Sequence, residues 1–196
     1  MTEKQAERLR LKIKQAKAAL AADKRRWGGF YDDSRGLRYV PPGYYIKLGD
    51  WKEGVKYLKW FAKNFPDDGG YPTFLFECAI ILFKSGDVKL AEKKAFQVFC
   101  SNTYVIEKFF GRAIIPIDKY ENSNISIPAY AETFIYSCDE DYLADFSNWL
   151  HDFTKTEKFV TASQKFVDFY KRLKTEKDYE TRVYLVRGAR QLEEDF

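Results

Sequence analysis

The sequence predicts an all-α protein, and three observations lead to this prediction. Residues 3–26 contain neither Gly nor Pro and consist largely of strong helix formers. From Pro42 to about residue 111, and again beyond Pro128, apolar residues recur at the helical spacing of three and four. Clusters of Gly, Asp and Pro separate these segments and end the helices. At 196 residues the chain fits a single domain with one shared core.

Residues 1–26 are expected to form a basic helix with a narrow apolar seam. They contain nine Lys or Arg against three acidic residues, a net charge of +6, so the rest of the chain carries −2 of the total +4. Five apolar residues alternate at spacings of three and four and share one side: Ala6, Leu9, Ile13, Ala16 and Leu20. Such a seam needs another helix. We expect this helix to cap its neighbours, or to form a homodimer.

Residues 27–41 are predicted to form an ordered loop, which helical hairpins follow. Pro41-Pro42 can start a short helix that ends at Leu48, and Gly49-Asp50 forms the turn to a helix over residues 51–64. The second hairpin is expected over residues 74–84 and 88–100, with a turn at residues 85–87. The spacing predicts two sets of buried residues: Val55, Leu58, Phe61 and Ala62, then Leu90, Ala91, Ala95 and Val98.

The C-terminal part is expected to be helical after an irregular connection at residues 112–127. Helices are predicted over residues 129–138, 142–153, 157–173 and 178–194. Asp141 and Thr156 stand where N-caps are expected. Two apolar stripes mark inner faces: Leu143, Phe146, Leu150 and Phe153, then Phe159, Ala162, Phe166, Phe169 and Leu173. The aromatic content of 18% either fills the core between crossing helices or lines a recognition surface.

Residues 42–111 resemble the tetratricopeptide-repeat family, with the clearest match to about residue 100. A turn Gly-Asp, an aromatic, a small residue, a large apolar residue and a terminal Pro appear in the family's order: Gly49, Asp50, Trp51, Gly54, Leu58 and Pro66. The next unit matches in both helices, with Leu75, Cys78, Ala79 and Leu82 on the first and Ala91, Ala95 and Val98 on the second, about Gly86-Asp87. The turn glycines are 37 residues apart, and Phe61 stands where the family prefers Ala, so the register is irregular.

The resemblance implies a short solenoid of helical hairpins with the basic helix at one end and C-terminal capping helices at the other. A hairpin over residues 142–173 would serve as the third unit, and the final helix as the cap. The implied concave surface binds a peptide or a helix of another protein, and four positions are expected to be exposed on it: Tyr44, Lys47, Thr73 and Glu77.

The aromatic loop is the second candidate surface. Acidic, basic and aromatic residues are crowded with glycines between Trp27 and Tyr39, and the candidates for contact are Tyr31, Arg35, Arg38 and Tyr39. The favoured interpretation is structural, with the aromatics sealing the groove beside the first helix while Asp and Arg pair with each other. The clusters at residues 67–68 and 139–141 are interpreted as helix caps.

Catalytic chemistry finds little support in the sequence. His151 is the only histidine, and Cys78, Cys100 and Cys138 have neither metal-ligand nor CxxC spacing. The best-marked nucleotide-binding and hydrolase motifs are missing. We therefore expect no enzyme activity, no cofactor and no metal. With no secretory signal and no apolar stretch long enough for a membrane span, a cytoplasmic protein is expected.

The sequence thus favours a protein-binding adaptor, and two alternatives remain open. A nucleic-acid-associated protein would use the first helix, with Arg8, Lys12, Arg25 and Arg26 on phosphates. An immunity or antitoxin-type inhibitor would bind one dedicated protein. The partner's identity is not encoded in these patterns.

Overall fold

The computed structural model describes residues 1–196 and contains helices and connecting segments but no strand, which confirms the all-α class. The α-helices in chain order are α1 (Glu3–Arg26), α2 (Val40–Leu48), α3 (Trp51–Asn64), α4 (Pro72–Lys84), α5 (Val88–Ser101), α6 (Val105–Phe109), α7 (Pro128–Glu132), α8 (Ala144–Phe153), α9 (Glu157–Thr175) and α10 (Tyr179–Asp195). Two short 3₁₀ helices, η1 (Leu37–Tyr39) and η2 (Asp141–Leu143), precede α2 and α8.

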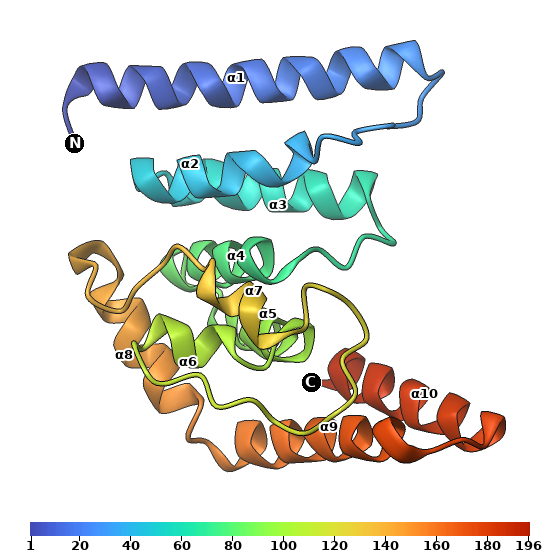
Figure 1. Ribbon diagram of the computed structural model, residues 1–196. Helices are drawn as coiled ribbons and strands as arrows, with labels where there is room; N and C mark the ends of the chain where they lie inside the picture. The colour runs from blue at the N-terminus through green and yellow to red at the C-terminus, as the bar shows by residue number, and fades with distance from the viewer.

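The helices form successive layers (Figure 1). Helix α1 lies across one end, followed by the pair α2 and α3, the pair α4 and α5, and finally α9 and α10 at the other end. Helix α8 lies along one side and packs on α4. Residues 112–127 contain no helix, as expected, and run over the front of the stack in this view.

Helix α1 has the predicted bounds because both of its ends are encoded locally. The Thr2 side chain accepts a hydrogen bond from the Gln5 amide, and the Gln5 side chain accepts one from the Thr2 amide, which is a complete capping box. Four residues of the predicted seam are buried, and Ile13 packs against Tyr45 of α2 and Tyr57 of α3. The seam is therefore covered by the chain's own first hairpin, which α1 caps.

The two hairpins turn where the Gly-Asp pairs predict. Gly49 adopts a left-handed φ of 66° that favours glycine, and Asp50 caps α3 by accepting a hydrogen bond from the Glu53 amide. Asp87 caps α5 in the same way. Helix α2 begins two residues before Pro42, since prolines are tolerated in the first turn of a helix.

Gly54 lies at a close helix crossing, but the partner differs from the one expected within a repeat. A Cβ atom at this position would come 3.0 Å from Ile81 Cγ2 on α4. The glycine therefore lets α3 approach the first helix of the next hairpin, rather than helix α2 of its own.

Helix α4 is the centre of the core. Ten of its 13 residues are buried, so neighbours surround it on nearly all sides. The ring of Phe76 lies 4.9 Å from those of Phe109 and Phe134 and 5.4 Å from that of Phe146, measured between centroids. The high aromatic content thus largely fills the space between crossing helices.

Two residues predicted to be buried in the hairpins are exposed. Ala62 is exposed, and 49% of Leu90 is accessible to solvent. The reason is that α3 and α5 both pack on α4 but hardly on each other. On α3 the buried side is formed by Gly54, Tyr57 and Phe61 instead.

The prediction of a helix over residues 129–138 is wrong beyond Glu132. Phe134 and Tyr136 are buried, whereas 68% of Ile135 is exposed, which is the alternation of an extended segment. The helical interpretation failed because the burial of these rings depends on Phe76, which is distant in sequence.

The third hairpin also differs from the expected one. Helix α9 pairs with α10, while α8 packs on α4, so residues 142–173 do not form the unit. Thr156 caps α9 as predicted by accepting a hydrogen bond from the Phe159 amide. Asp141 begins η2 and does not cap α8.

Candidate functional site

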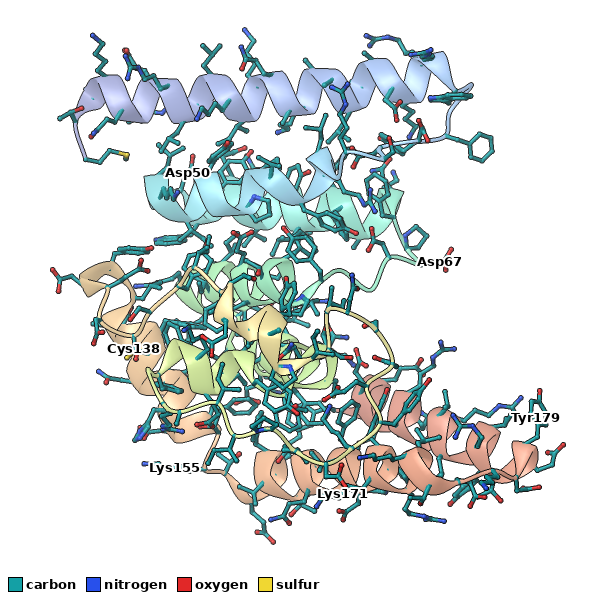
Figure 2. The ribbon with its side chains drawn as sticks, viewed as in Figure 1. Asp50, Asp67, Cys138, Lys155, Lys171 and Tyr179 are labelled. Carbon is teal, nitrogen blue, oxygen red and sulfur yellow. The ribbon has the colours of Figure 1, made fainter.

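A groove of about 900 Å³ opens between α1 and the hairpin beneath it. Helix α1 runs antiparallel to α2, so its N-terminal turns lie over the end of α2 and the start of α3 (Figure 1). Asp50, the N-cap of α3, marks this end of the hairpin in Figure 2. Helix α1 has 24 residues and α2 only nine, so the N-terminal turns of α1 extend past the end of α2 and leave the groove beneath them.

The interior of the groove is apolar. Ile46 and Leu48 of α2 and Trp51 of α3 contribute from the hairpin, and Leu9 and Leu11 contribute from α1. Leu11 lies off the seam, on the side of α1 where its neighbours are charged or polar, and it is 54% exposed. Tyr142 of η2 lines the groove from the C-terminal half of the chain.

The charges around this apolar surface have one sign. Arg8 and Lys12 of α1 and Lys47 of α2 line the groove, and no Asp or Glu does. None of the three cations forms an ion pair. The Lys12 ammonium lies 5.6 Å from the centre of the Tyr44 ring, within the range of a cation–π contact. The groove therefore presents three uncompensated positive charges beside an apolar surface.

The groove brings together residues that the sequence assigned to two different surfaces. Lys47 was expected on the concave surface, whereas Arg8 and Lys12 were candidates for nucleic-acid contact. Tyr44, also expected on the concave surface, contacts Lys12 but does not line the groove. Sequence reasoning missed Leu11, Leu48 and Trp51 as site residues. An apolar Leu11 on the charged side of α1 was the available signal, because no core explains its placement.

The surface of α4 that was expected to be concave and exposed is covered by the chain itself. Glu77 is only 6% exposed, so its predicted exposure is wrong. The Tyr136 hydroxyl lies 2.7 Å from Glu77 Oε1 as a donor, and the Thr73 and Tyr130 hydroxyls are 3.3 Å apart. The extended segment after α7 fills this face because Phe134 and Tyr136 bury their rings there.

Burial changes the acidity of Glu77. Loss of solvent raises the pKa of this carboxyl from its usual 4.5 to about 8, against the opposing effects of the Tyr136 hydrogen bond, the Lys47 charge and the Gly43 amide. At neutral pH the proton is therefore largely retained. A protonated carboxyl beneath the covering segment serves packing, because it has no access to a substrate.

The aromatic loop is held by an ion-paired network, which agrees with its structural interpretation. Asp33 accepts hydrogen bonds from the Leu37 and Arg38 amides at 2.8 and 3.0 Å. The Arg38 guanidinium binds Asp33 at 3.0 Å and Asp68 at 2.6 Å, and the Tyr39 hydroxyl donates to Asp68 at 2.7 Å. Asp68 therefore joins two connections and does not cap a helix, contrary to the expectation for residues 67–68.

The electrostatics of this network follow from its contacts. Burial opposes ionisation of Asp68, but hydrogen bonds from Tyr39, Arg38 and the Gly70 amide outweigh it and lower the pKa of the carboxyl. Tyr31 packs on Phe65 with ring centres 4.7 Å apart. Of the four candidates in the loop, only Arg35 is exposed, since Tyr31, Arg38 and Tyr39 are partly buried by internal contacts.

The four candidate residues for nucleic-acid contact do not form one patch. Arg8 and Lys12 line the groove, whereas Arg25 and Arg26 lie at the far end of α1. Lys12 and Arg25 are 13 residues apart, which separates them by about 20 Å along the helix axis. Arg25 and Arg26 are exposed, and the Arg26 guanidinium lies 5.7 Å from the centre of the Trp27 ring.

No family model, curated protein or solved structure matches this chain. The function of the groove must therefore be inferred from its own geometry.

The remaining chemistry of the chain is sparse. No group of three or more His, Cys, Asp or Glu side chains is placed to hold a metal ion, and the three cysteines are free. His151 lies beside Asp152 and the ring of Phe110, away from the groove. None of the helices has the length and apolar character that crossing a membrane requires.

Proposed function

We propose that this protein is a non-enzymatic binding module whose α1–α2 groove receives an acidic amphipathic helix from a partner protein. One observation supports this most strongly: Leu11, Leu48 and Trp51 form an apolar surface bordered by three free cations and by no carboxylate. A helix with one apolar face and acidic flanks is complementary to both features.

The dimensions of the groove agree with this occupant. A helix is about 10 Å across with its side chains, so about three turns half-embedded in a surface displace several hundred Å³. The groove offers about 900 Å³ and is open along one side. The partner can therefore lie along α1 without displacing any element of the stack.

The apolar surface favours a protein over a nucleic acid. Phosphate contacts need cations but gain nothing from exposed aliphatic side chains such as Leu11. The basic residues at the two ends of α1 are also too far apart to act on the same few phosphates. A nucleic-acid ligand is therefore the main competing outcome of the test.

The same proposal includes a tetratricopeptide-like arrangement of the helices. Two consecutive hairpins with capped Gly-Asp turns, α2–α3 and α4–α5, stack in order and are closed by α1. These features support the resemblance. The binding surface differs from the family's concave face, because Glu77 and its surroundings are covered by residues 128–138.

The experiment is fluorescence anisotropy with a synthetic amphipathic helix that carries Leu on one face and Glu on its flanks. A second peptide with Lys in place of Glu and a single-stranded oligonucleotide serve as comparison ligands. The account predicts binding of the acidic peptide and at least about a tenfold loss of affinity on Leu11→Glu or Lys12→Glu.

The matched control is Lys14→Glu, which makes the same charge change on an exposed residue of α1 outside the groove. It should change the affinity far less than Lys12→Glu does. Stronger binding of the oligonucleotide, or equal effects of the two lysine substitutions, would reject the groove as the binding site.

A further inference from the structure

A second groove, of about 270 Å³, lies between α3 and α5 with α4 as its floor. Val55, Leu58 and Ala62 line it from α3, Leu90 lines it from α5, and Cys78 and Leu82 line it from α4. The groove is distinct from the one beneath α1, since the two share no lining residue. It exists because α3 and α5 diverge over α4.

Its walls are made by the residues whose helical spacing predicts burial. Val55, Leu58, Ala62 and Leu90 follow the pattern of inward-facing positions, yet Ala62 is exposed and Leu90 is 49% exposed. An apolar face with the pattern of a core that is left open to solvent is characteristic of a ligand-binding surface.

The charges at the rim select an anion. Lys59, Lys93 and Lys94 line the groove and form no ion pair, and the Lys93 ammonium donates a hydrogen bond to the Glu194 carbonyl oxygen. Of the two rim carboxylates, Asp68 pairs with Arg38, whereas Asp87 caps α5 and has no cationic partner, so the three lysines outnumber the one unpaired carboxylate. The available charge at the rim is therefore positive.

Lys94 lines the groove together with Cys78 of its floor. Burial raises the pKa of the Cys78 thiol to about 12, and the charge of Lys94 opposes this shift. The Lys94 ammonium donates a hydrogen bond to Gln97 Oε1 at 2.7 Å. Burial raises the pKa of Glu193, and the charge of Lys94 opposes this shift. The Glu193 side chain lines a neighbouring cavity and not this groove.

The volume indicates the kind of ligand. A helix about 10 Å across does not fit into this space. A space of about 270 Å³ with an apolar lining has the size of a small-molecule site, and a flexible alkyl chain fits it where a helix does not.

We propose that the α3–α5 groove binds a medium-chain carboxylate, with the alkyl chain against Leu58 and Leu90 and the carboxylate beside the lysines of the rim. The ligand covers the apolar face that the fold leaves open, and its carboxylate lies beside the lysine ammonium groups of the rim. This site is independent of the partner-binding groove beneath α1.

Isothermal titration calorimetry with decanoate, octanoate and decyltrimethylammonium, each below its micelle concentration, tests the proposal. Decanoate should bind. Octanoate lacks two methylenes and should bind roughly fifteenfold more weakly, because each buried methylene contributes about a fourfold factor. Decyltrimethylammonium has the same chain with a cationic head and should bind far more weakly. No heat with millimolar decanoate, or equal affinity for the cationic ligand, overturns the proposal.

Substitutions locate the site. Leu90→Glu places a carboxylate on the groove wall, and an acidic residue in the first turn of α5 is compatible with the helix. It should weaken decanoate binding at least about tenfold, as should Ala62→Glu at an exposed position of the other wall. Lys94→Gln should weaken the binding of decanoate but not the binding of decyltrimethylammonium.

The control is Leu11→Glu, the same substitution in the groove beneath α1, which should leave decanoate binding unchanged. Thermal melts by circular dichroism report whether each variant is folded. If Leu90→Glu does not fold, Ala62→Glu still tests the site. If Leu11→Glu lowers the affinity for decanoate as much as Ala62→Glu does, the α3–α5 groove is not the site.

Discussion

The Tyr136 hydroxyl donates a 2.7 Å hydrogen bond to Glu77 Oε1, joining residues 59 positions apart. This contact fastens the extended segment after α7 onto the face of α4. The face of α4 that a solenoid of hairpins would offer is therefore filled by the chain's own aromatic residues, and for this reason we propose the groove beneath α1 as the binding site.

The first prediction concerns the pH dependence of stability. The pKa of Glu77 is raised from 4.5 to about 8 in the folded state, so the folded protein binds more protons than the unfolded chain between these values. This contribution is fully present below pH 4.5 and is lost as the pH rises towards and through 8, at a rate of up to about 1.4 kcal/mol per pH unit.

Glu77→Gln should remove this component, since the amide keeps the size of the side chain and can pair with the Tyr136 hydroxyl. Urea denaturation from pH 5 to pH 9 should show that the variant gains stability relative to the wild type as the pH rises. Glu7→Gln, at an exposed carboxyl of α1, is the control and should give a curve parallel to that of the wild type. Parallel curves for Glu77→Gln as well would mean that this carboxyl is ionised in the fold.

The second prediction concerns the network of the aromatic loop. Arg38→Met removes the partner of both Asp33 and Asp68 and leaves two carboxylates without their cation. We expect a loss of about 2–4 kcal/mol in the free energy of unfolding, because breaking one side of a largely buried pair costs more than removing an exposed charge. Arg35→Met, in the same loop but exposed, should change stability by less than about 0.5 kcal/mol. Equal effects would show that the ion pairs do not hold the loop.

The third prediction concerns the crossing of α3 and α4. Gly54→Ala adds a methyl group 3.0 Å from Ile81 Cγ2, and the strain should outweigh the gain in helix propensity, with a net loss of about 1–2 kcal/mol. Ile81→Ala removes the opposing atoms. The double variant should therefore lose less stability than the sum of the losses in the two single variants. Denaturation of the wild type, both single variants and the double variant measures this difference. Strict additivity would place Gly54 outside this crossing.

The fourth prediction concerns α1 as a structural cap. Ile13→Ala opens a cavity against Tyr45 and Tyr57 and should cost about 2–3 kcal/mol. Leu11→Ala, two residues earlier and 54% exposed, should cost much less. Thermal unfolding of the two variants compares how much a seam residue and a groove residue contribute to stability. If Ile13→Ala is neutral, α1 does not stabilise the stack and its seam is free for another partner.

The features that could be predicted from the sequence are those determined by neighbouring residues. The bounds of α1 and α3 follow from Thr2, Asp50 and the Gly and Pro clusters beyond each helix, all of which act within a turn of the helix end. The buried seam of α1 follows from the helical period alone.

Features that depend on distant contacts were missed. Phe134 and Tyr136 were assigned to a helix because nothing near them in sequence shows that Phe76 covers them in an extended segment. Leu90 and Ala62 were placed in the core because their spacing is correct, whereas their exposure depends on the divergence of α3 and α5.

The candidate site was partly visible in the sequence. Arg8, Lys12 and Lys47 were named, but as members of two unrelated surfaces. Their meeting depends on α1 running antiparallel over α2, which no local pattern encodes. Glu77 was placed on an exposed face for the same reason, because its cover comes from residues more than 50 positions later in the chain.

The most direct test of the central claim is site-specific photo-crosslinking in native lysate treated with nuclease. A photoreactive amino acid replaces Leu11 in the groove in one protein and Lys14 outside it in another. The account predicts a discrete protein adduct from position 11, mapped by mass spectrometry to an acidic amphipathic helix, and none from position 14. Adducts of equal yield from both positions, or an adduct that disappears with nuclease, would contradict the assignment of the α1–α2 groove to a protein partner.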